Sequence, residues 1–408
     1  MSRALSENGR MTDLERIFTL WRAMEAAAGD YVLATVVALE GPGYRKPGAS
    51  MILTADGRRA GTVSGGCLEA EVASRAWWLT AHGPTLQRYS TAEEDGERPW
   101  GSGCGGTVFL LLERRQTARP LLSALETAFN RRAPLAVATV LEGPYIGRRA
   151  FAGLDPSEDR GLAMEPDLPA AAPLQALAEQ ALADRSSLDE KIPVQGTETR
   201  VWANFRPARP GLHIFGAGDD AQPLHRLAKE LGWFVSVADG RSHLATRDRF
   251  PVADEIRVLH NADLSAAVAA ASPVAFQAPH PEDAAIVMTH SFEQDSRILA
   301  FLLARDPVPA YIGVLGPQRR TRELLAEAAA LLHLPETAVA AQAERWLARL
   351  HAPTGLDLGS ESPETVALSI LAEVQKSFTA ASALPLRQVR AAAPRVPRES
   401  ALASPQGS

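Results

Sequence analysis

The first third of the chain alternates between helical and strand-like spacing of its apolar residues. The pattern predicts β-strands over residues 31–40, 51–63 and 105–115, the second folded at an Asp-Gly turn, and a helix over residues 68–82. An amphipathic helix, capped by Thr12 or Asp13, is expected before the first strand. Its apolar residues recur every three or four positions, at Leu14, Ile17, Phe18, Trp21 and Met24.

Two segments of the first half are similar to each other. LATVVALEGPGYRK, which begins at Leu33, is echoed by VATVLEGPYIGRR, which begins at Val137. The first half therefore holds either a repeated strand and loop unit or merely two similar strands. Residues 151–188 are rich in Ala, Pro, Asp and Glu, which predicts an irregular insertion with one helix near residues 173–184.

The second half alternates short apolar strands with helices after the proline-containing stretch 206–211. This alternation predicts a parallel sheet with right-handed crossovers. The expected fold class is α/β: an N-terminal α+β domain over residues 1–205, followed by a Rossmann-like, doubly wound parallel sheet over residues 206–377. Residues 378–408 lack periodicity and are rich in Ala, Pro, Ser and Arg, which predicts a disordered tail.

The composition restricts the class of protein. With 408 residues, of which 46% are hydrophobic, the chain can form two or three domains with sizeable cores. A formal net charge of -6 argues against a general nucleic-acid binder, and the chain lacks the run of about 20 apolar residues that a membrane span needs. The chain shows no secretion signal and has two cysteines, too few for a disulfide framework. We therefore expect a cytoplasmic protein with reduced thiols.

The segment GAGDDA starts at Gly216, follows an apolar strand and opens a helix. Its pattern, with Asp239 at the end of the next strand, is typical of a dinucleotide site. Gly216 and Gly218 would let the backbone approach a phosphate, and Asp239 would accept from a ribose hydroxyl. The two aspartates of the segment would repel a pyrophosphate unless they point away. The alternative is that the glycines serve only the packing of strand against helix.

Two further groups lie where parallel strands are expected to end. His290 and Asp295, in MTHSFEQD, are candidates for a general base and the residue that orients it. The alternative is that His290 caps the following helix or fills a loop. Arg319 and Arg320, in GVLGPQRR, would either hold an anion or belong to an exposed helix start.

Cys67 follows Gly65 and Gly66 and directly precedes a predicted helix. The positive end of the helix dipole would stabilise a thiolate there, although Glu69 and Glu71 in the first turn oppose that effect.

The second cysteine, Cys104, lies within the segment GSGCGG. Such a glycine-rich segment can form a concave nest of N–H groups suited to a phosphate or an oxyanion. The alternative for both cysteines is a small buried apolar side chain beside a tight turn. Neither cysteine belongs to a CxxC pair or has histidine partners at zinc-site spacing.

Two segments of the first half, GPGYRKPGASMILTADGRRAGTVSGGCLEAEV and GSGCGGTVFLLLE, together resemble the N-terminal domain of the XdhC/CoxI family. Members of this family are accessory proteins of xanthine dehydrogenase and related molybdenum hydroxylases. In the second half, LHIFGAGDDAQPLHRLAKELGWFVSVADGR, IVMTHSFEQD, YIGVLGPQRRTREL and HAPTGLDLGSESPETVALSILAEV resemble the family's Rossmann-like C-terminal domain. The resemblance covers residues 12–150 and 205–376.

The resemblance implies a protein that binds the molybdenum cofactor (molybdopterin) and keeps it sulfurated, or helps a cysteine desulfurase to sulfurate it. It also implies delivery of the cofactor to the apo form of a xanthine dehydrogenase-type hydroxylase. Cys67 and Cys104 are the expected functional residues, each as a metal ligand, a persulfide relay or a steric gate. Further expected pocket residues are Gly65, Gly66, Gly105 and Gly106, with Arg45 and Lys46 either neutralising a phosphate or lying in an exposed turn.

Three classes of function follow from these observations. The leading one is a cofactor carrier and maturation chaperone rather than a turnover enzyme. The second is an NAD(P)-dependent oxidoreductase that uses the GAGDDA loop and His290, and the third is an interaction scaffold. The expected partners are the apo-hydroxylase and the cysteine desulfurase, with a homodimer as a further candidate, and neither nucleic acid nor membrane. NAD(P) or another nucleotide is the second candidate cofactor.

Overall fold

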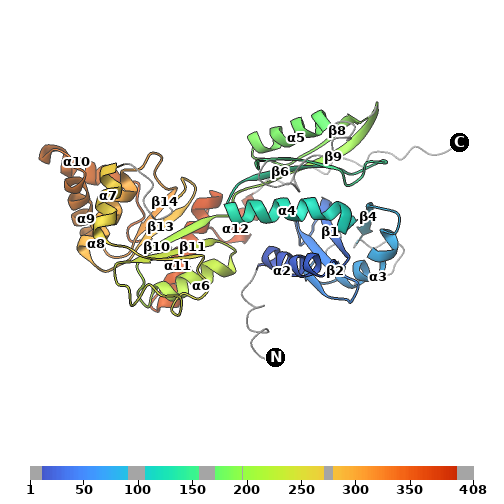
Figure 1. The fold of residues 1–408 in the computed structure, drawn as a ribbon. Coiled ribbons are helices and arrows are strands. Elements are labelled where there is room, and N and C mark those ends of the chain that lie inside the picture. The colour runs from blue at the N-terminus through green and yellow to red at the C-terminus, as the bar shows by residue number, and fades with distance from the viewer. Residues whose placement is uncertain (1–11, 91–105, 156–170, 195, 271–278, 393–408) are drawn as a thin grey trace. The chain divides into compact units, whose positions relative to one another are not determined.

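The computed structural model describes residues 12–90, 106–155, 171–194, 196–270 and 279–392 (Figure 1). The chain divides into two compact units. The first runs to Pro210 and includes Lys229–Phe234, and the second comprises Gly211–Ala228 and the chain from Val235 onward.

The first half of unit 1 is a five-stranded antiparallel sheet with helices on both faces. The strands are ordered β3-β2-β1-β5-β4. Helix α2 begins with a capping box, in which Thr12 and Glu15 each bond to the other's backbone N–H. The elements are α2 (Asp13–Ala26), β1 (Tyr31–Glu40), β2 (Ser50–Thr54), β3 (Arg59–Gly61), α3 (Glu69–Leu79), β4 (Thr85–Ser90) and β5 (Thr107–Arg114).

The second half of unit 1 repeats this succession of helix, hairpin, helix and hairpin. Its strands are ordered β7-β6-β9-β8, which corresponds to β2-β1-β5-β4 of the first sheet. The similar segments at Leu33 and Val137 thus begin in the equivalent strands β1 and β6, so the echo marks a repeated unit. The elements are α4 (Arg115–Arg131), β6 (Leu135–Val140), β7 (Arg149–Ala152), α5 (Ala171–Ala183), β8 (Leu188–Val194) and β9 (Thr197–Arg206).

The region predicted as an irregular insertion differs from that expectation. Its predicted helix is present as α5, but α5 packs on the sheet of β6 and β9 and buries Leu174, Leu177 and Ala181 there. Residues 156–170 lie outside the described part. In Ala-rich segments the buried and exposed positions differ little in hydrophobicity, so this helix was predicted within an irregular region. Such segments nevertheless pack well against small residues such as Ala138 and Ala203.

Alternating side chains of β1 build two separate cores. Tyr31 and Leu33 pack with α2 and α4 on one face, whereas Val32 and Ala34 pack with α3 on the other. Leu135 of β6 joins the core that contains α4, and α5 covers the opposite face of the second sheet. The first helix of each repeat therefore lies inside unit 1 and the second helix lies outside.

A buried ion pair joins the two repeats. Arg149 of β7 contacts the Glu113 carboxylate of β5, and the two side chains are only 4% and 0% exposed. Arg149 Nη1 also donates to the carbonyls of Thr117 and Gly147 at 2.9 and 3.0 Å. These bonds compensate part of the cost of burying the guanidinium.

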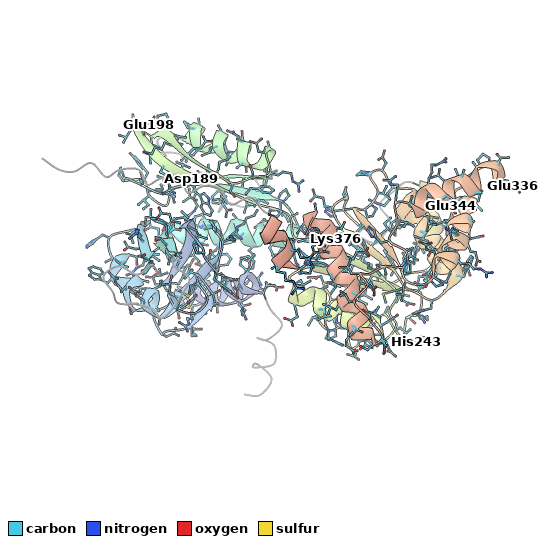
Figure 2. All side chains as sticks on the ribbon, turned by 180° about the vertical axis from the view of Figure 1, so that it is seen from behind. Asp189, Glu198, His243, Glu336, Glu344 and Lys376 are labelled. Atoms are coloured by element: carbon cyan, nitrogen blue, oxygen red, sulfur yellow. The ribbon has the colours of Figure 1, made fainter. Side chains whose placement is uncertain are left out.

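We expect Arg149→Leu to lower the free energy of unfolding by about 3–5 kcal/mol, because Glu113 is left as a buried uncompensated charge. Adding Glu113→Leu should recover most of the loss. The control is Arg200→Leu, which removes an exposed pair with Asp189 on the β8–β9 hairpin (Figure 2) and should cost about 1 kcal/mol or less. Urea denaturation followed by circular dichroism measures all three; equal losses for Arg149→Leu and Arg200→Leu would contradict this role.

Unit 2 is a parallel sheet of order β12-β11-β10-β13-β14. The order reverses between β10 and β13, as in doubly wound nucleotide-binding folds, and this confirms the predicted Rossmann-like fold. The elements are β10 (Gly211–Phe215), α6 (Ala221–Glu230), β11 (Phe234–Asp239), β12 (Glu255–Val258), α7 (Asn261–Ala270), β13 (Ala284–Val287), α8 (Phe292–Leu303), β14 (Tyr311–Val314), α9 (Gln318–Leu331), α10 (Glu336–Leu347) and α11 (Pro363–Thr379).

The first part of the stretch predicted as a disordered tail contains helical residues. Helix α11 continues to Thr379, and a short helix α12 (Leu386–Ala392) follows; residues 393–408 lie outside the described part. Among the described helices, none combines the length and the apolar character of a membrane span.

Candidate functional site

The register of the first sheet brings three connections of the chain to one of its ends. Glu40, at the end of β1, pairs with Thr107, at the start of β5, and Thr107 also pairs with Ser90, at the end of β4. At the same end, Gly61 of β3 pairs with Met51, next to the start of β2. The loop 41–49, the Cys67 loop 62–68 and the connection 91–106 therefore all begin or end there.

These connections contact one another where they are described. A side chain on Gly106 would place its Cβ 2.0 Å from the carbonyl oxygen of Pro42, so only glycine allows this approach. The ring of Tyr44, whose side chain is 75% exposed, faces Gly65, and Arg45 Nε donates to Thr62 O at 3.2 Å. The loop 41–49 thus contacts both the Cys67 loop and Gly106 at this end of the sheet.

Ser64 is the centre of the Cys67 loop. Its Oγ donates to Glu69 Oε2 at 2.6 Å and accepts from the N–H groups of Gly66 and Leu68, each at 3.1 Å. Cys67 Sγ lies 3.6 Å from the same oxygen as a donor, so a line of hydrogen bonds leads from the thiol through Ser64 to the carboxylate of Glu69.

Glu69 is buried, and its carboxylate closes the loop. Oε1 accepts from Ser64 N at 2.8 Å and Val63 N at 3.1 Å. Burial alone would raise the pKa of Glu69, but the hydrogen bonds from Ser64 and Val63 outweigh it and lower the pKa. The carboxylate is therefore ionised at neutral pH. Its charge fixes the loop, whereas the sequence indicated only that Glu69 would oppose the stabilisation of a thiolate at Cys67.

The other predicted residues of this site have distinct surroundings. Cys67 is a free, partly buried thiol that packs against the apolar core under α3, and it precedes the helix by two residues because Leu68 is the N-cap. Arg45 pairs with Asp13 rather than facing outward, and Lys46 is exposed. Cys104 and Gly105 lie outside the described residues. Within the described ranges, no three His, Cys, Asp or Glu side chains are grouped to hold a metal ion.

We expect Glu69→Gln to lower the free energy of unfolding by about 1–3 kcal/mol at pH 7, because two backbone donors and Ser64 lose a charged acceptor. The lowered pKa of Glu69 means that its ionised form stabilises the fold above the unfolded pKa and that this contribution disappears as the pH falls. The difference from wild type should stay constant above about pH 5 and shrink below about pH 4.

The matched control is Glu71→Gln, two positions further along α3, where Glu71 pairs with the exposed Arg75. This variant should cost about 0.5 kcal/mol or less. Chemical denaturation between pH 3 and pH 7 gives both profiles, and identical profiles for the two variants would remove Glu69 from its closing role.

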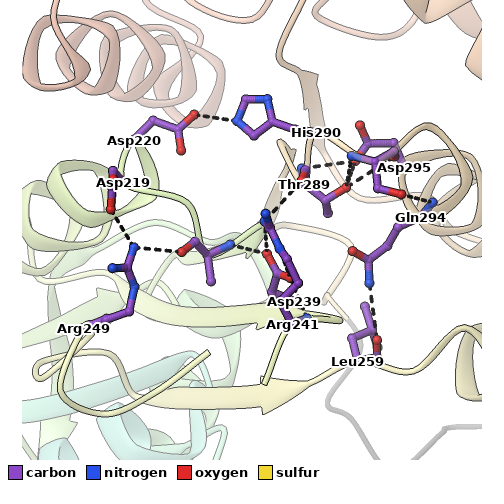
Figure 3. Close-up of polar contacts among 12 residues, drawn as sticks. Asp219, Asp220, Asp239, Arg241, Arg249, Leu259, Thr289, His290, Gln294 and Asp295 are labelled. Atoms are coloured by element: carbon purple, nitrogen blue, oxygen red, sulfur yellow. Dashed lines mark hydrogen bonds and ion pairs between the residues drawn. The ribbon is translucent and has the colours of Figure 1, made fainter. Parts of the chain in front are cut away.

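In unit 2, the GAGDDA loop lies at the strand-order reversal, but its surface differs from the predicted dinucleotide site. A Cβ on Gly216 would approach Met288 O to 2.4 Å, so this glycine serves packing. The space next to Gly218 holds Asp220, whose Oδ1 would lie 2.7 Å from an added Cβ. Asp220 Oδ2 lies 3.1 Å from His290 Nε2 (Figure 3). A carboxylate thus lies where a pyrophosphate would approach the loop, which disfavours that ligand there.

Asp239 is fully buried and its carboxylate is saturated. Oδ2 accepts from Ala217 N at 2.7 Å and Arg241 Nη2 at 2.8 Å, and Oδ1 accepts from Arg241 N and Nε at 2.8 and 3.0 Å. Burial would raise the pKa of Asp239, but these bonds, led by those of the Arg241 side chain, lower it. No acceptor site is left for a ribose hydroxyl. Asp239 instead holds the glycine loop and orients Arg241 (Figure 3).

The predicted pair of His290 and Asp295 is not formed. Asp295 is fully buried and accepts from Thr289 N, Thr289 Oγ1 and Arg320 Nη2, so it anchors the start of α8. His290 is 61% exposed at its side chain and pairs with Asp220, while Ser291 caps α8. Arg320 is thus engaged inside the fold, whereas Arg319 is 91% exposed.

Comparisons with known proteins agree with this architecture. Residues 24–90 match the XdhC and CoxI family and residues 212–374 match the XdhC Rossmann domain. A protein of Bacillus subtilis (strain 168), named as a probable subunit of xanthine dehydrogenase, is 32% identical over 351 residues, which cover 84% of this chain and 92% of that protein. The molybdenum cofactor insertion chaperone PaoD of Escherichia coli (strain K12) is 26% identical over 354 residues, which cover 84% and 82%. A crystal structure described as a xanthine dehydrogenase from Bacillus halodurans, 27% identical, gives a TM-score of 0.66 and covers 93% of this chain and all of that one.

Proposed function

The chain belongs to the XdhC and CoxI family, and on this basis we propose that it is an accessory protein that binds the molybdenum cofactor and passes it to a molybdenum hydroxylase. Two relatives, one named as a molybdenum cofactor insertion chaperone and one as part of a xanthine dehydrogenase, support a role in the maturation of an enzyme of the xanthine dehydrogenase type. In this proposal the protein is a carrier rather than a turnover enzyme and acts in the cytoplasm.

The observation that carries the proposal is the contact of the loop 41–49 with both the Cys67 loop and Gly106 at one end of the first sheet. The close approach of Gly106 to Pro42 and the facing of Tyr44 and Gly65 bring backbone and one aromatic ring to this surface, and Lys46 of the same loop is exposed. Such a surface fits a flat pterin ring, and a partly exposed thiol beside it is a suitable ligand for a soft metal. The residues present therefore fit the cofactor.

In the proposed site, Cys67 would serve as a ligand of the metal. Ser64 and Glu69 keep the loop in one conformation. Tyr44 contributes stacking area and shields the ligand from water. When bound, the cofactor would supply molybdenum with an exchangeable sulfido ligand. Sulfuration with a cysteine desulfurase and delivery to the apo-hydroxylase are the finer steps of the same proposal, with Cys104 as the second thiol.

An NAD(P)-dependent oxidoreductase is not proposed. Asp220 covers the glycine loop and Asp239 has no acceptor site left, so the two groups on which that function was predicted are engaged within the protein. His290, its predicted base, is paired with Asp220 and not with Asp295.

We expect Cys67→Ala to fold normally but to retain at least about tenfold less molybdenum and pterin than wild type after purification from a molybdenum-replete host, because a thiolate ligand is lost. Metal analysis and pterin fluorescence measure retention, and activation of the apo-hydroxylase measures delivery. Ser74→Ala, an exposed change on helix α3, which follows the Cys67 loop, should behave as wild type. Equal retention by Cys67→Ala and wild type would exclude the thiol from binding.

A further inference from the structure

A crevice of about 490 Å³ opens at the carboxyl ends of β11, β12 and β13 in unit 2, which is where ligands bind in doubly wound folds. It is beside the GAGDDA loop but separate from it. Its volume suits a small-molecule ligand. The crevice is lined by Gly240, Arg241, Leu259, His260, Asn261, Thr289, His290, Ser291 and Gln294.

Arg241 is the charged side chain of this lining, and it is held in one orientation. Asp239 takes the edge formed by Nε and Nη2, and Nη2 also donates to Thr289 O at 3.2 Å. Within the described part of the chain, Nη1 donates to no protein group, and the side chain is 43% exposed. Asp239 therefore holds the guanidinium of Arg241 with Nη1 toward the crevice. Because the side chain is already fixed, it loses little conformational entropy when a ligand binds.

Apart from Gly240 and Leu259, the remaining lining is polar. His260 and His290 have exposed side chains, and none of the lining residues is acidic. The nearby carboxylates are not part of the lining, and each bonds to one of its residues: Asp239 to Arg241, Asp220 to His290, and Glu293 to Asn261. Helix α7 begins at Asn261, and Ser291 is the N-cap of helix α8. Both residues line the crevice, so the positive ends of both helix dipoles lie beside it. Leu259 adds an apolar surface for a ring.

We propose that this crevice binds the phosphate monoester of a nucleoside-sized ligand, with Arg241 Nη1 on the phosphate. A phosphate monoester matches a guanidinium by charge and by hydrogen-bond geometry. The glycine loop, covered by Asp220, plays no part in binding. The inference does not rest on the cofactor role of unit 1, because every residue that carries it belongs to unit 2.

The test is isothermal titration of the full-length protein with AMP, CMP, inorganic phosphate and adenosine. We expect AMP and CMP to bind, phosphate to bind more weakly and to compete with them, and adenosine to bind at least about tenfold more weakly than AMP, because it lacks the charge-assisted bond. Arg241→Gln should weaken AMP binding roughly 10- to 100-fold. The matched control Arg319→Gln, an exposed arginine of α9, should leave it unchanged.

His260→Ala provides a second variant, because the His260 side chain is exposed and makes no protein hydrogen bond within the described residues. It should weaken AMP binding several-fold even if Arg241→Gln unfolds. No binding of any phosphate up to about 10 mM, or equal binding by wild type and both variants, overturns the inference. Cys67→Ala should bind AMP as wild type does. Wild-type protein that binds AMP normally but retains no cofactor would count against the proposed function alone.

Discussion

The long antiparallel pairing of β1 with β5 is the interaction on which unit 1 depends. Its register places Glu40 opposite Thr107, and it thereby fixes where the loop after β1 and the connection before β5 meet. A shift by one residue would turn Tyr31 and Leu33 from the α4 side to the α3 side, so both cores oppose it. Hydrophobic burial on the two faces of β1 therefore determines the geometry of the surface around Cys67.

The repeated organisation of unit 1 explains why only one half carries this surface. Both halves have the same strand order, but β8 and β9 are joined at Gly196 by a tight turn, whereas β4 and β5 are joined by the long connection 91–106 that contains Cys104. The Cys67 loop also lies in the first half. The second half packs against the first through α4 and through the buried pair of Arg149 and Glu113. The first repeat therefore carries the Cys67 loop, and the second repeat stabilises the first.

Unit 2 reuses the ends of its parallel strands differently from a dinucleotide-binding domain. The acid at the end of β11, Asp239, faces the interior of the glycine loop and the guanidinium of Arg241 instead of a ribose. Because its four acceptor positions are filled, its contribution to binding is indirect: it holds an arginine at the crevice. An aspartate at the end of the second strand, which contacts the ribose in dinucleotide-binding domains, here positions Arg241 instead.

The sequence by itself determined much of the fold. The strand-helix alternation after residue 206 and the apolar spacing of residues 14–24 were sufficient to predict the Rossmann-like unit and α2. Both are local patterns: short apolar runs that become buried strands, and apolar residues at helical spacing. The motifs around Cys67 and GAGDDA were also sufficient to identify the family. The echo at Leu33 and Val137 indicated the repeat, but the Ala-rich region around α5 hid its second half.

Only the tertiary structure decided the partners of the polar side chains. Asp295 follows His290 closely in sequence, yet its carboxylate turns to Thr289 and Arg320, while His290 contacts Asp220 from the loop after β10. Glu69 likewise bonds back to Ser64 and Val63. A hydrogen bond requires a particular direction and a distance of about 3 Å, and these depend on how distant strands are brought together. Sequence spacing fixes which residues share an element, but it carries no information on which acceptor a buried donor reaches.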